Sequence, residues 1–411
     1  MSTESSSESS PVPRMPLSYA VTRIDSGTSV NGEDRSRSNG EAGVLKLSCI
    51  SGGQFDPGEH KVVVASDLER VSTPVRAHTI IMSRKNTAAL VGAVAYVPVD
   101  EPHLYLSDLL WQLHVDPQKA NPKWLAALLS TPDARRRIQA TSAGTSGSMK
   151  GINKNAILKL EFPFPDLTEQ ARQLGALEEL GSAQAVMDRL LRAKADYRNG
   201  LAEDLLNGRR RFDGFTAPWR EMKLSRFFAP KDDRAPTKTP LILSCSKVYG
   251  ILPQSERFSK QLASVSNAHY KHIMPGDLVY DPMLLWDASI AFSEYEGIVS
   301  PAYETLSWIG DEVGDRRFFK ALFKSDTMRY VYTTISQGTN ARRRKAPVTD
   351  FLKVSLKMPE AAEQRRIADL LSDLDTEINF LRKQRDALNE QKKGLMQKLL
   401  TGEVRLKEFR T

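Results

Sequence analysis

The sequence predicts an α+β protein with a pseudo-two-fold internal repeat, in which two mixed α/β domains are separated by two long antiparallel helices. Two patterns predict this fold: pairs of similar residues recur at one fixed offset, and each repeat ends in a heptad-like apolar stripe. The composition agrees, because 411 residues with 40% hydrophobic and 26% charged side chains are typical of a globular chain. At about 150 residues per domain, this length predicts two to three domains.

The repeat is most regular in its C-terminal part. Gly144-Thr145 recurs as Gly338-Thr339, and Glu169-Gln170 recurs as Glu363-Gln364. Both pairs are 194 residues apart, since 338 minus 144 and 363 minus 169 give the same number. The match runs without a gap for about 70 residues, which indicates two copies of one module. Further upstream the copies align with small insertions, as in Leu45-Lys46-Leu47-Ser48-Cys49 against Leu241-Ile242-Leu243-Ser244-Cys245.

The repeat divides the chain into five segments. Residues 1–16 are rich in serine and have no apolar periodicity, so we expect a disordered tail. The domains then span 17–166 and 209–360, and the long helices occupy 167–208 and, with a C-terminal tail, 361–411.

Each domain combines strand-like and helix-like runs. The expected strands lie at residues 79–82, 91–97 and 277–280, and at Leu158 and Leu352; the expected short helices lie at 122–129 and 317–323.

The two long helices are predicted from apolar residues at alternating spacings of four and three. In the second copy these are Ile367, Leu371, Leu374, Ile378, Leu381, Leu388, Leu395 and Leu399, interrupted by Arg385 and Lys392. In the first copy they are Leu177, Leu180, Met187, Leu191, Leu201 and Leu205, with Gln173, Gln184, Lys194 and Arg198 also in the stripe. About 40 residues make each helix about 60 Å long. We expect the helices to pack against each other or against partner helices, and the polar interruptions to meet acidic groups of a partner.

The sequence offers little catalytic chemistry. It has no Gly-Lys pair for a phosphate-binding loop, no dinucleotide fingerprint and no Asn-Pro-Pro-Tyr or Asp-Pro-Pro-Tyr motif of an amino-methyltransferase. Six histidines show no paired-ligand spacing, and His269 and His272 are expected to face solvent or nucleic acid rather than a metal. Cys49 and Cys245 are repeat equivalents, which favours buried structural thiols and a reducing cytoplasm. The weakly polar stretch 88–99 is too short to span a membrane.

The positive signal is basic loops in a chain with a net charge of +8. Arg342-Arg343-Arg344-Lys345 follows Gly338-Thr339-Asn340, and the equivalent loop of the first copy holds Gly144, Thr145 and Lys150, with Lys154 beyond it. Such donors suit phosphates or base edges, whereas a single charge run could simply be solvated. Weaker candidates are Arg84, Lys85, Lys247, Tyr249, Lys271 and Tyr280.

Three motifs carry a resemblance to a known family. Residues 275–280 read Pro-Gly-Asp-Leu-Val-Tyr, residues 297–303 read Gly-Ile-Val-Ser-Pro-Ala-Tyr, and residues 363–368 read Glu-Gln-Arg-Arg-Ile-Ala ahead of Leu-Leu-Thr-Gly at 399–402. With these motifs the chain resembles the specificity subunit of type I restriction-modification systems. The first copy departs from the pattern, with Ala77-His78-Thr79 in place of Pro275-Gly276-Asp277.

The resemblance implies two target recognition domains, each reading one half of a bipartite site in double-stranded DNA, and two antiparallel helices. It also implies two methyltransferase subunits that bring S-adenosylmethionine chemistry, and motor-nuclease subunits that bring ATP hydrolysis with Mg²⁺ and cleavage. This chain would itself be non-catalytic and hold no cofactor. The helix residues expected to dock subunits are Leu177, Leu180, Met187, Leu191, Leu371, Leu374, Ile378, Leu381 and Leu388. The alternatives are a scaffold or DNA-recognition protein outside restriction, a subunit of a methylation-only system, and an enzyme fused to a recognition domain.

Overall fold

The computed structural model describes residues 12–142, 149–234, 241–257, 269–336 and 345–406. The chain forms two compact units, residues 1–187 with 384–411 and residues 188–383, which are described in turn. Each unit holds one α/β domain and parts of both long helices.

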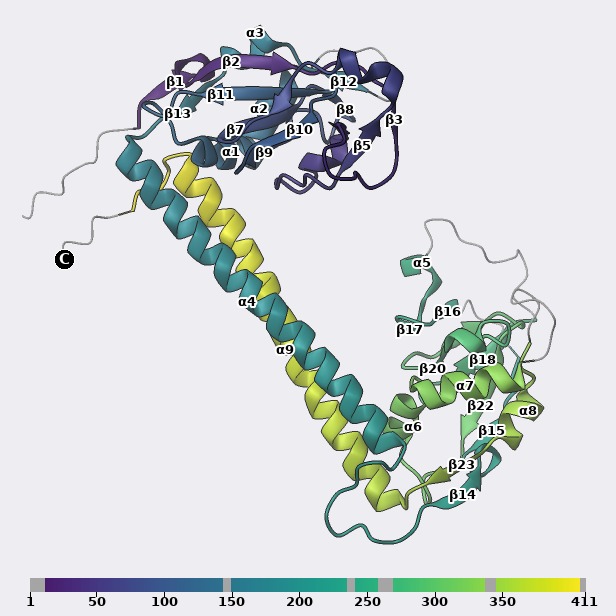
Figure 1. Cartoon of the computed structure of the whole chain (residues 1–411). Helices are drawn as coiled ribbons and strands as arrows, with labels where there is room; N and C mark the ends of the chain where they lie inside the picture. Colours follow the sequence, from purple (N-terminus) through teal and green to yellow (C-terminus); the bar gives the residue numbers. More distant parts are fainter. Residues whose placement is uncertain (1–11, 143–148, 235–240, 258–268, 337–344, 407–411) are drawn as a thin grey trace, which may run out of the picture. The chain divides into compact units, whose positions relative to one another are not determined.

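The domain of the first unit is built on an antiparallel sheet with the strand order β2-β11-β7-β9 (Figure 1). These strands are β2 (Val21–Ser26), β7 (Thr79–Ser83), β9 (Val94–Val97) and β11 (Leu110–Val115). Helix α1 (Pro122–Ser130) packs on β7 and β9 and is followed by α2 (Pro132–Ala140). Alternate residues of β7 and β11, such as Ile80, Met82 and Leu113, are buried with Trp124 of α1 in one core.

Smaller sheets complete this domain. A five-stranded sheet has the order β3-β5-β4-β10-β6, with β3 (Gly32–Glu33), β4 (Gly43–Leu45), β5 (His60–Val63), β6 (Pro74–Val75) and β10 (Glu101–Tyr105). Two ribbons pair β1 (Arg14–Pro16) with β13 (Glu161–Pro163), and β8 (Lys85–Asn86) with β12 (Lys150–Gly151). Helix α3 (Lys154–Leu158) precedes β13.

The domain of the second unit repeats this plan. Its main sheet has the order β15-β22-β19-β20, with β15 (Phe228–Pro230), β19 (Leu278–Tyr280), β20 (Ile290–Phe292) and β22 (Glu304–Trp308). The remaining ribbons pair β14 (Arg220–Lys223) with β23 (Ser355–Met358), β16 (Leu243–Ser246) with β17 (Gly250–Pro253), and β18 (Lys271–Ile273) with β21 (Gly297–Val299). The helices are α5 (Gln254–Arg257), α6 (Arg316–Leu322), α7 (Asp326–Ile335) and α8 (Val348–Lys353).

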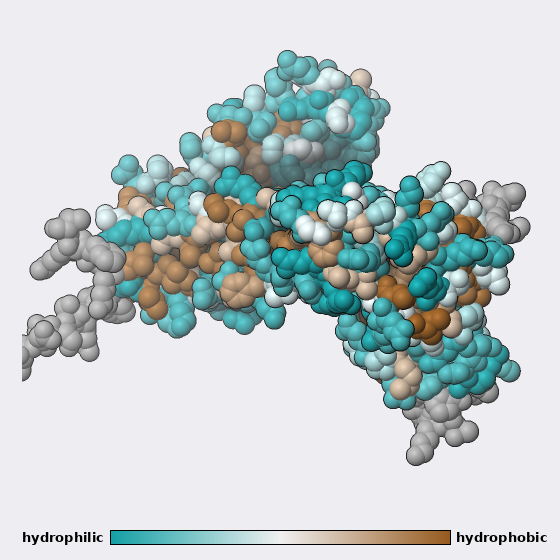
Figure 2. Space-filling view, turned by 90° about the horizontal axis from the view of Figure 1, so that it is seen from below, coloured by the Kyte–Doolittle hydropathy of each residue, from teal (hydrophilic) through white to brown (hydrophobic). Residues whose placement is uncertain are grey.

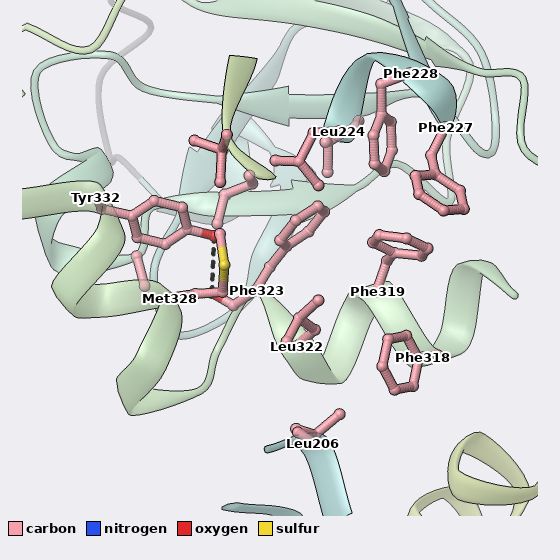
Figure 3. Packing of buried hydrophobic residues seen from close by; sticks show 14 of the residues in the cluster. Leu206, Leu224, Phe227, Phe228, Phe318, Phe319, Leu322, Phe323, Met328 and Tyr332 are labelled. Atoms are coloured by element: carbon pink, nitrogen blue, oxygen red, sulfur yellow. Dashed lines mark hydrogen bonds between the residues drawn. The ribbon is translucent and has the colours of Figure 1, made fainter. Parts of the chain in front are cut away.

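An aromatic cluster fills the core of the second domain (Figure 3). Phe228 contacts Phe319 edge to face, with ring centroids 5.5 Å apart, and lies 5.6 Å from Phe323. Tyr332 is wholly buried and donates its hydroxyl hydrogen to the carbonyl of Phe323 at 3.1 Å. Its polar atom is therefore satisfied within the core.

The structure extends the repeat beyond the part that the sequence aligned without gaps. The offset of 194 relates the starts of β11 and β22, at residues 110 and 304, and the starts of α1 and α6, at 122 and 316. The main sheets also share one strand order. The predicted fold of two similar α/β domains is thus confirmed.

The long helices are α4 (Leu167–Leu206) and α9 (Ala361–Leu400), each of 40 residues as predicted. Their pairing is antiparallel in each unit. In the first unit Lys392 Nζ donates to Gln184 Oε1 at 3.1 Å. In the second unit Arg198 makes two hydrogen bonds to the Asp375 carboxylate, at 2.8 and 2.9 Å, and Lys194 lies 2.7 Å from Glu377.

These contacts correct the expectation that Lys194, Arg198 and Lys392 meet acidic groups of a partner. The antiparallel pairing places Asp375 and Glu377 in the first half of α9 beside Arg198 and Lys194 in the second half of α4, so these two cations find their acids within the chain. Arg385 pairs with the adjacent Asp386.

Two further expectations were wrong. Arg14–Pro16, assigned to the tail, pair with β13, because extended residues there complete a ribbon with Glu161–Pro163. Leu158 and Leu352 lie in helices α3 and α8 rather than strands. Helix α3 forms because the side chain of Asn153 accepts hydrogen bonds from the amides of Asn155 and Ala156. Residues 1–11 lie outside the described part of the chain.

A buried glutamine attaches each long helix to its domain. Gln170 accepts a hydrogen bond from the amide of Asn121 at 2.8 Å, and Gln364 accepts one from the amide of Asp315 at 3.2 Å. Asn121 and Asp315 are the N-cap residues of α1 and α6. Each glutamine also donates from Nε2 to the carbonyl of the proline five residues before it, at 2.9 Å. The junction is therefore the same in both copies.

Glu363 adds a charged contact at the second junction. It is wholly buried and receives two hydrogen bonds from Arg211, at 2.9 and 2.8 Å, and one from Trp219 Nε1 at 3.2 Å. Arg211 belongs to the segment that follows α4, so this cluster fixes the entry to the second domain.

We expect Glu363→Ala to destabilise the chain by about 2–3 kcal/mol, because it leaves Arg211 and Trp219 without their shared acceptor. Asp375→Ala is the control: its carboxylate is half-exposed, and such a pair contributes at most about 1 kcal/mol. Equilibrium urea unfolding of both variants measures the difference, and equal losses would contradict a special role for the buried cluster.

Candidate nucleic-acid interface

In each domain, the residue that ends the donor-rich loop contacts the segment that follows strand β7 or strand β19. In the first domain the amide of Ile152 donates to the carbonyl of Arg84 at 3.0 Å. In the second, the amide of Ala346 donates to the carbonyl of Pro282 at 3.0 Å. Ile152 and Ala346 are repeat equivalents, and Arg84 and Pro282 each follow the corresponding strand, β7 or β19. Each domain therefore joins the segment after this strand to the end of its donor-rich loop.

In the first domain this site is a short basic ribbon. Strands β8 and β12 pair Lys150 with Asn86 and Gly151 with Lys85. The candidates Arg84, Lys85 and Lys150 are thereby brought together. Gly144 and Thr145 lie outside the described residues.

Lys154, by contrast, makes contacts within the fold. Its Nζ donates to the carbonyl of Ile24 at 2.8 Å and lies 5.7 Å from the centre of the Trp111 ring. The side chain thus joins α3 to strand β2, and a nucleic-acid contact of Lys154 stays a prediction.

In the second domain, the candidates Gly338, Thr339, Asn340, Arg342, Arg343 and Arg344 lie outside the described residues. Lys345, which follows them, is exposed. Tyr280 is wholly buried, so the prediction of a DNA contact there was wrong. Its hydroxyl donates to the carbonyl of Ala346 at 3.2 Å, and burial raises the pKa of this hydroxyl well above its usual value. Tyr280 therefore stays protonated and anchors the end of the basic loop.

The other candidates of the second domain divide between the fold and the surface. Lys271 donates to the carbonyl of Tyr303 at 2.8 Å and lies 3.6 Å from Glu304, so it is a structural residue and not a free cation. Lys247 is exposed beside Asp287, with 2.8 Å between Nζ and Oδ2. Tyr249 is 76% exposed.

His272 and the two cysteines are surrounded by other residues of the fold. His272 lies 3.3 Å from Glu296, and no group of three potential metal ligands occurs among the residues described. Both cysteines are buried, as predicted. Burial, with smaller effects of Asp56 and Glu59, raises the pKa of Cys49 to about 12, which makes this thiol a poor nucleophile.

The predicted subunit-docking residues are all buried or half-buried on the long helices. Leu177, Leu191, Leu371 and Ile378 are buried, and Leu180, Met187, Leu374, Leu381 and Leu388 are half-buried. Leu177 packs in the core of the first domain, and Leu371 packs in the core of the second, which Leu374 also contacts. A role of these nine residues in docking a subunit stays a prediction.

Sequence reasoning missed the apolar side chains that the long helices expose instead. Val186 is 54% exposed on α4, and its repeat equivalent Phe380 is 58% exposed on α9. Leu190 and Tyr197 are also exposed on α4. Figure 2 shows hydrophobic patches between the hydrophilic residues of the visible face. Their position in the sequence could have indicated this exposure, because Val186 and Phe380 lie outside the heptad stripe, next to its members Met187 and Leu381. No helix in the described ranges is both long and apolar enough to cross a membrane.

Comparison with known proteins supports the resemblance. No protein-family model matches the sequence. A stretch of 124 residues, 29% of the chain, is 33% identical to the type I restriction enzyme MjaVIII specificity subunit of Methanocaldococcus jannaschii, and the match spans 28% of that protein's length.

The solved structures extend the likeness to the fold. The chain is similar to the HsdS subunit from Thermoanaerobacter tengcongensis, with a TM-score of 0.53, 14% identity, and coverage of 96% of this chain and 98% of that one. It is also similar to a chain from a study of complex assembly and conformational transition of the type I R-M system, with a TM-score of 0.61, 16% identity, and coverage of 96% and 99%. These likenesses confirm the predicted architecture.

We expect Tyr280→Phe to lower the stability of the chain by about 1–2 kcal/mol, because it leaves the buried carbonyl of Ala346 without its donor. Tyr330→Phe is the matched control, since Tyr330 is 73% exposed. Thermal unfolding of the two variants distinguishes the anchor from a surface hydroxyl. Wild-type stability of Tyr280→Phe would contradict the anchoring role.

Proposed function

We propose that this chain is the DNA sequence-specificity subunit of a type I restriction-modification complex. The observation that carries the proposal is the repeat of one scaffold with different surface residues. Two domains share a strand order and a glutamine junction, but one presents Lys85 and Lys150 where the other presents Lys345. A bipartite, asymmetric DNA site requires two domains of similar fold whose DNA-contacting surfaces carry different side chains.

In this proposal each domain binds its half-site through the surface around the donor-rich loop. Cations of these loops neutralise phosphates and set the position of the duplex, while neighbouring side chains contact base edges. The contacts of Lys154, Lys271 and Tyr280 within the fold support a role for them in holding these surfaces in place rather than in touching DNA.

The exposed apolar residues of the long helices would dock two methyltransferase subunits. Val186 and Phe380 are related by the repeat, so the helices offer two equivalent positions to two copies of one partner. Those subunits would supply S-adenosylmethionine chemistry, and motor-nuclease subunits would supply ATP hydrolysis with Mg²⁺ and cleavage. The chain itself would recognise DNA in the cytoplasm without catalysing a reaction.

Exchanging residues 17–166 for the same segment of a related chain is expected to change one half-site of the methylated sequence and leave the other unchanged. The reason is that each domain has its own core and its own surface loops. Single-molecule sequencing of DNA methylated by the assembled complex reads both half-sites. A change in both would contradict the proposal.

A matched variant separates base identity from spacing. One heptad inserted into α4 lengthens the helix by about 10.5 Å, close to three base pairs of duplex. This variant should change the number of base pairs between the two half-sites and leave the bases of both half-sites unchanged. Changed bases with an unchanged separation would contradict the proposal that each domain reads one half-site and that the helices set the distance between them.

A charge at either exposed apolar position of the helices should remove one methyltransferase subunit. We expect Val186→Asp and Phe380→Asp each to leave one bound copy and the double variant none, because a carboxylate cannot be buried unpaired in an apolar contact. Co-purification and native mass spectrometry give the stoichiometry. Val99→Asp is the control, since Val99 is 57% exposed in the first domain. Two copies retained by the double variant would exclude this surface.

A further inference from the structure

We infer that Val248 and Tyr249, at the tip of the β16–β17 hairpin, contact base edges in the half-site of the second domain. This inference deepens the proposed function and rests on it. The two side chains are 69% and 76% exposed, although both are largely apolar. Met283 and Leu284, which precede the short helical turn Leu285–Asp287, are exposed as well. Grouped apolar residues at a surface indicate a contact with another molecule.

The tip is held in one shape by its own backbone. Strands β16 and β17 pair Ser246 with Gly250, which leaves three residues in the turn. Ser246 Oγ accepts hydrogen bonds from the amides of Val248 and Tyr249, both at 3.3 Å. Gly250 has a φ of +72°, a left-handed conformation that closes such a turn and that glycine adopts without strain. The exposed side chains therefore project from an ordered turn.

Lys324 fixes this turn to the rest of the domain. Its Nζ donates to the carbonyl of Lys247 at 3.2 Å and to the carbonyl of Ala288 at 2.7 Å. Burial lowers the pKa of this lysine. On the opposite side, Lys247 Nζ reaches Asp287 at 2.8 Å. The half-buried Lys324 therefore holds the tip in position. Binding a ligand then does not have to include the entropic cost of ordering the tip.

The tip and the basic loop meet the same segment of chain, residues 282–288. The hairpin is tied to its end through Asp287 and Ala288. Ala346, which follows the basic run, contacts the beginning of this segment, where its amide donates to the carbonyl of Pro282. A duplex whose phosphates meet Lys345, the exposed cation next to Ala346, would therefore run beside the tip. This continuity favours DNA as the occupant.

The first domain lacks these side chains. Aligning residues 45–49 with 241–245 places Gly52 and Gly53 opposite Val248 and Tyr249 in sequence. In the structure these glycines follow the short helical turn Leu47–Ile50 and do not form the tip of a hairpin. Both glycines have positive φ, +87° and +78°. The two copies therefore differ at this position in local structure as well as in side chains, as expected of a surface that contacts different bases in each half-site. Apolar contact with a base edge, such as the thymine methyl group in the major groove, is a known form of direct readout.

The test selects the full-length chain against a pool of duplexes with a random central region and then measures affinity for the selected site. We expect Tyr249→Ala and Val248→Ala each to weaken binding about ten-fold and to relax one or two base positions of the second half-site only. Tyr330→Ala, which removes an equally exposed tyrosine from α7, should bind and select like the wild type. Melting temperatures of all variants should match, because the removed side chains are exposed.

Salt dependence separates base contacts from phosphate contacts. The tip variants remove no cation, so the slope of log affinity against log salt should remain that of the wild type. Wild-type affinity and selection, equal weakening on every sequence, or relaxation of the first half-site would each overturn the inference. If the wild-type chain selects no bipartite sequence, the proposed function itself fails.

Discussion

The arrangement of each copy depends on one buried amide, the side chain of Gln170 or of Gln364. It joins the first turn of a long helix to the N-cap of the first helix of the domain. A buried amide that lost these partners would cost the free energy of an unmade hydrogen bond, so the junction tolerates little change in angle. Ion pairs support each junction further along the helix, Lys123 with Glu178 in the first copy and Arg317 with Asp369 in the second. The direction of each helix relative to its own domain is therefore set by packing inside that copy.

A fixed junction lets the surface vary without moving the scaffold. The hairpin of the second domain carries Val248 and Tyr249, whereas the residues aligned with them in the first domain are glycines that follow a short helical turn. The main sheets nevertheless keep the same strand order. Tyr280 shows how the scaffold reaches the surface: it is wholly buried, but its hydroxyl holds the residue that follows the basic run. Buried residues thus position the loops, and exposed residues are free to differ between the copies.

The sequence predicted long-range organisation better than individual contacts. The offset of 194 and the heptad spacing are patterns over tens of residues, so they predicted both 40-residue helices and the duplicated domains. Tyr280 was misjudged because a polar side chain looks the same in sequence whether it meets solvent or a buried carbonyl, and sheet register decides between them. Val186 and Phe380 were missed for the opposite reason, since they lie outside the stripe that made the helices recognisable.

The seam of the helix pair shows that the copies have also diverged where they contact each other. Arg198 meets Asp375, but the positions equivalent to this pair are Lys392 and Gly181, and Lys392 bonds to Gln184 instead. Half-exposed pairs of this kind contribute at most about 1 kcal/mol each, so their main effect is on register rather than stability. A shift of α4 by one heptad, about 10.5 Å, would separate Arg198 and Lys194 from Asp375 and Glu377. The polar residues that weaken the apolar stripe therefore select one alignment of the two helices. A seam made only of leucines would not distinguish between alignments that differ by one heptad.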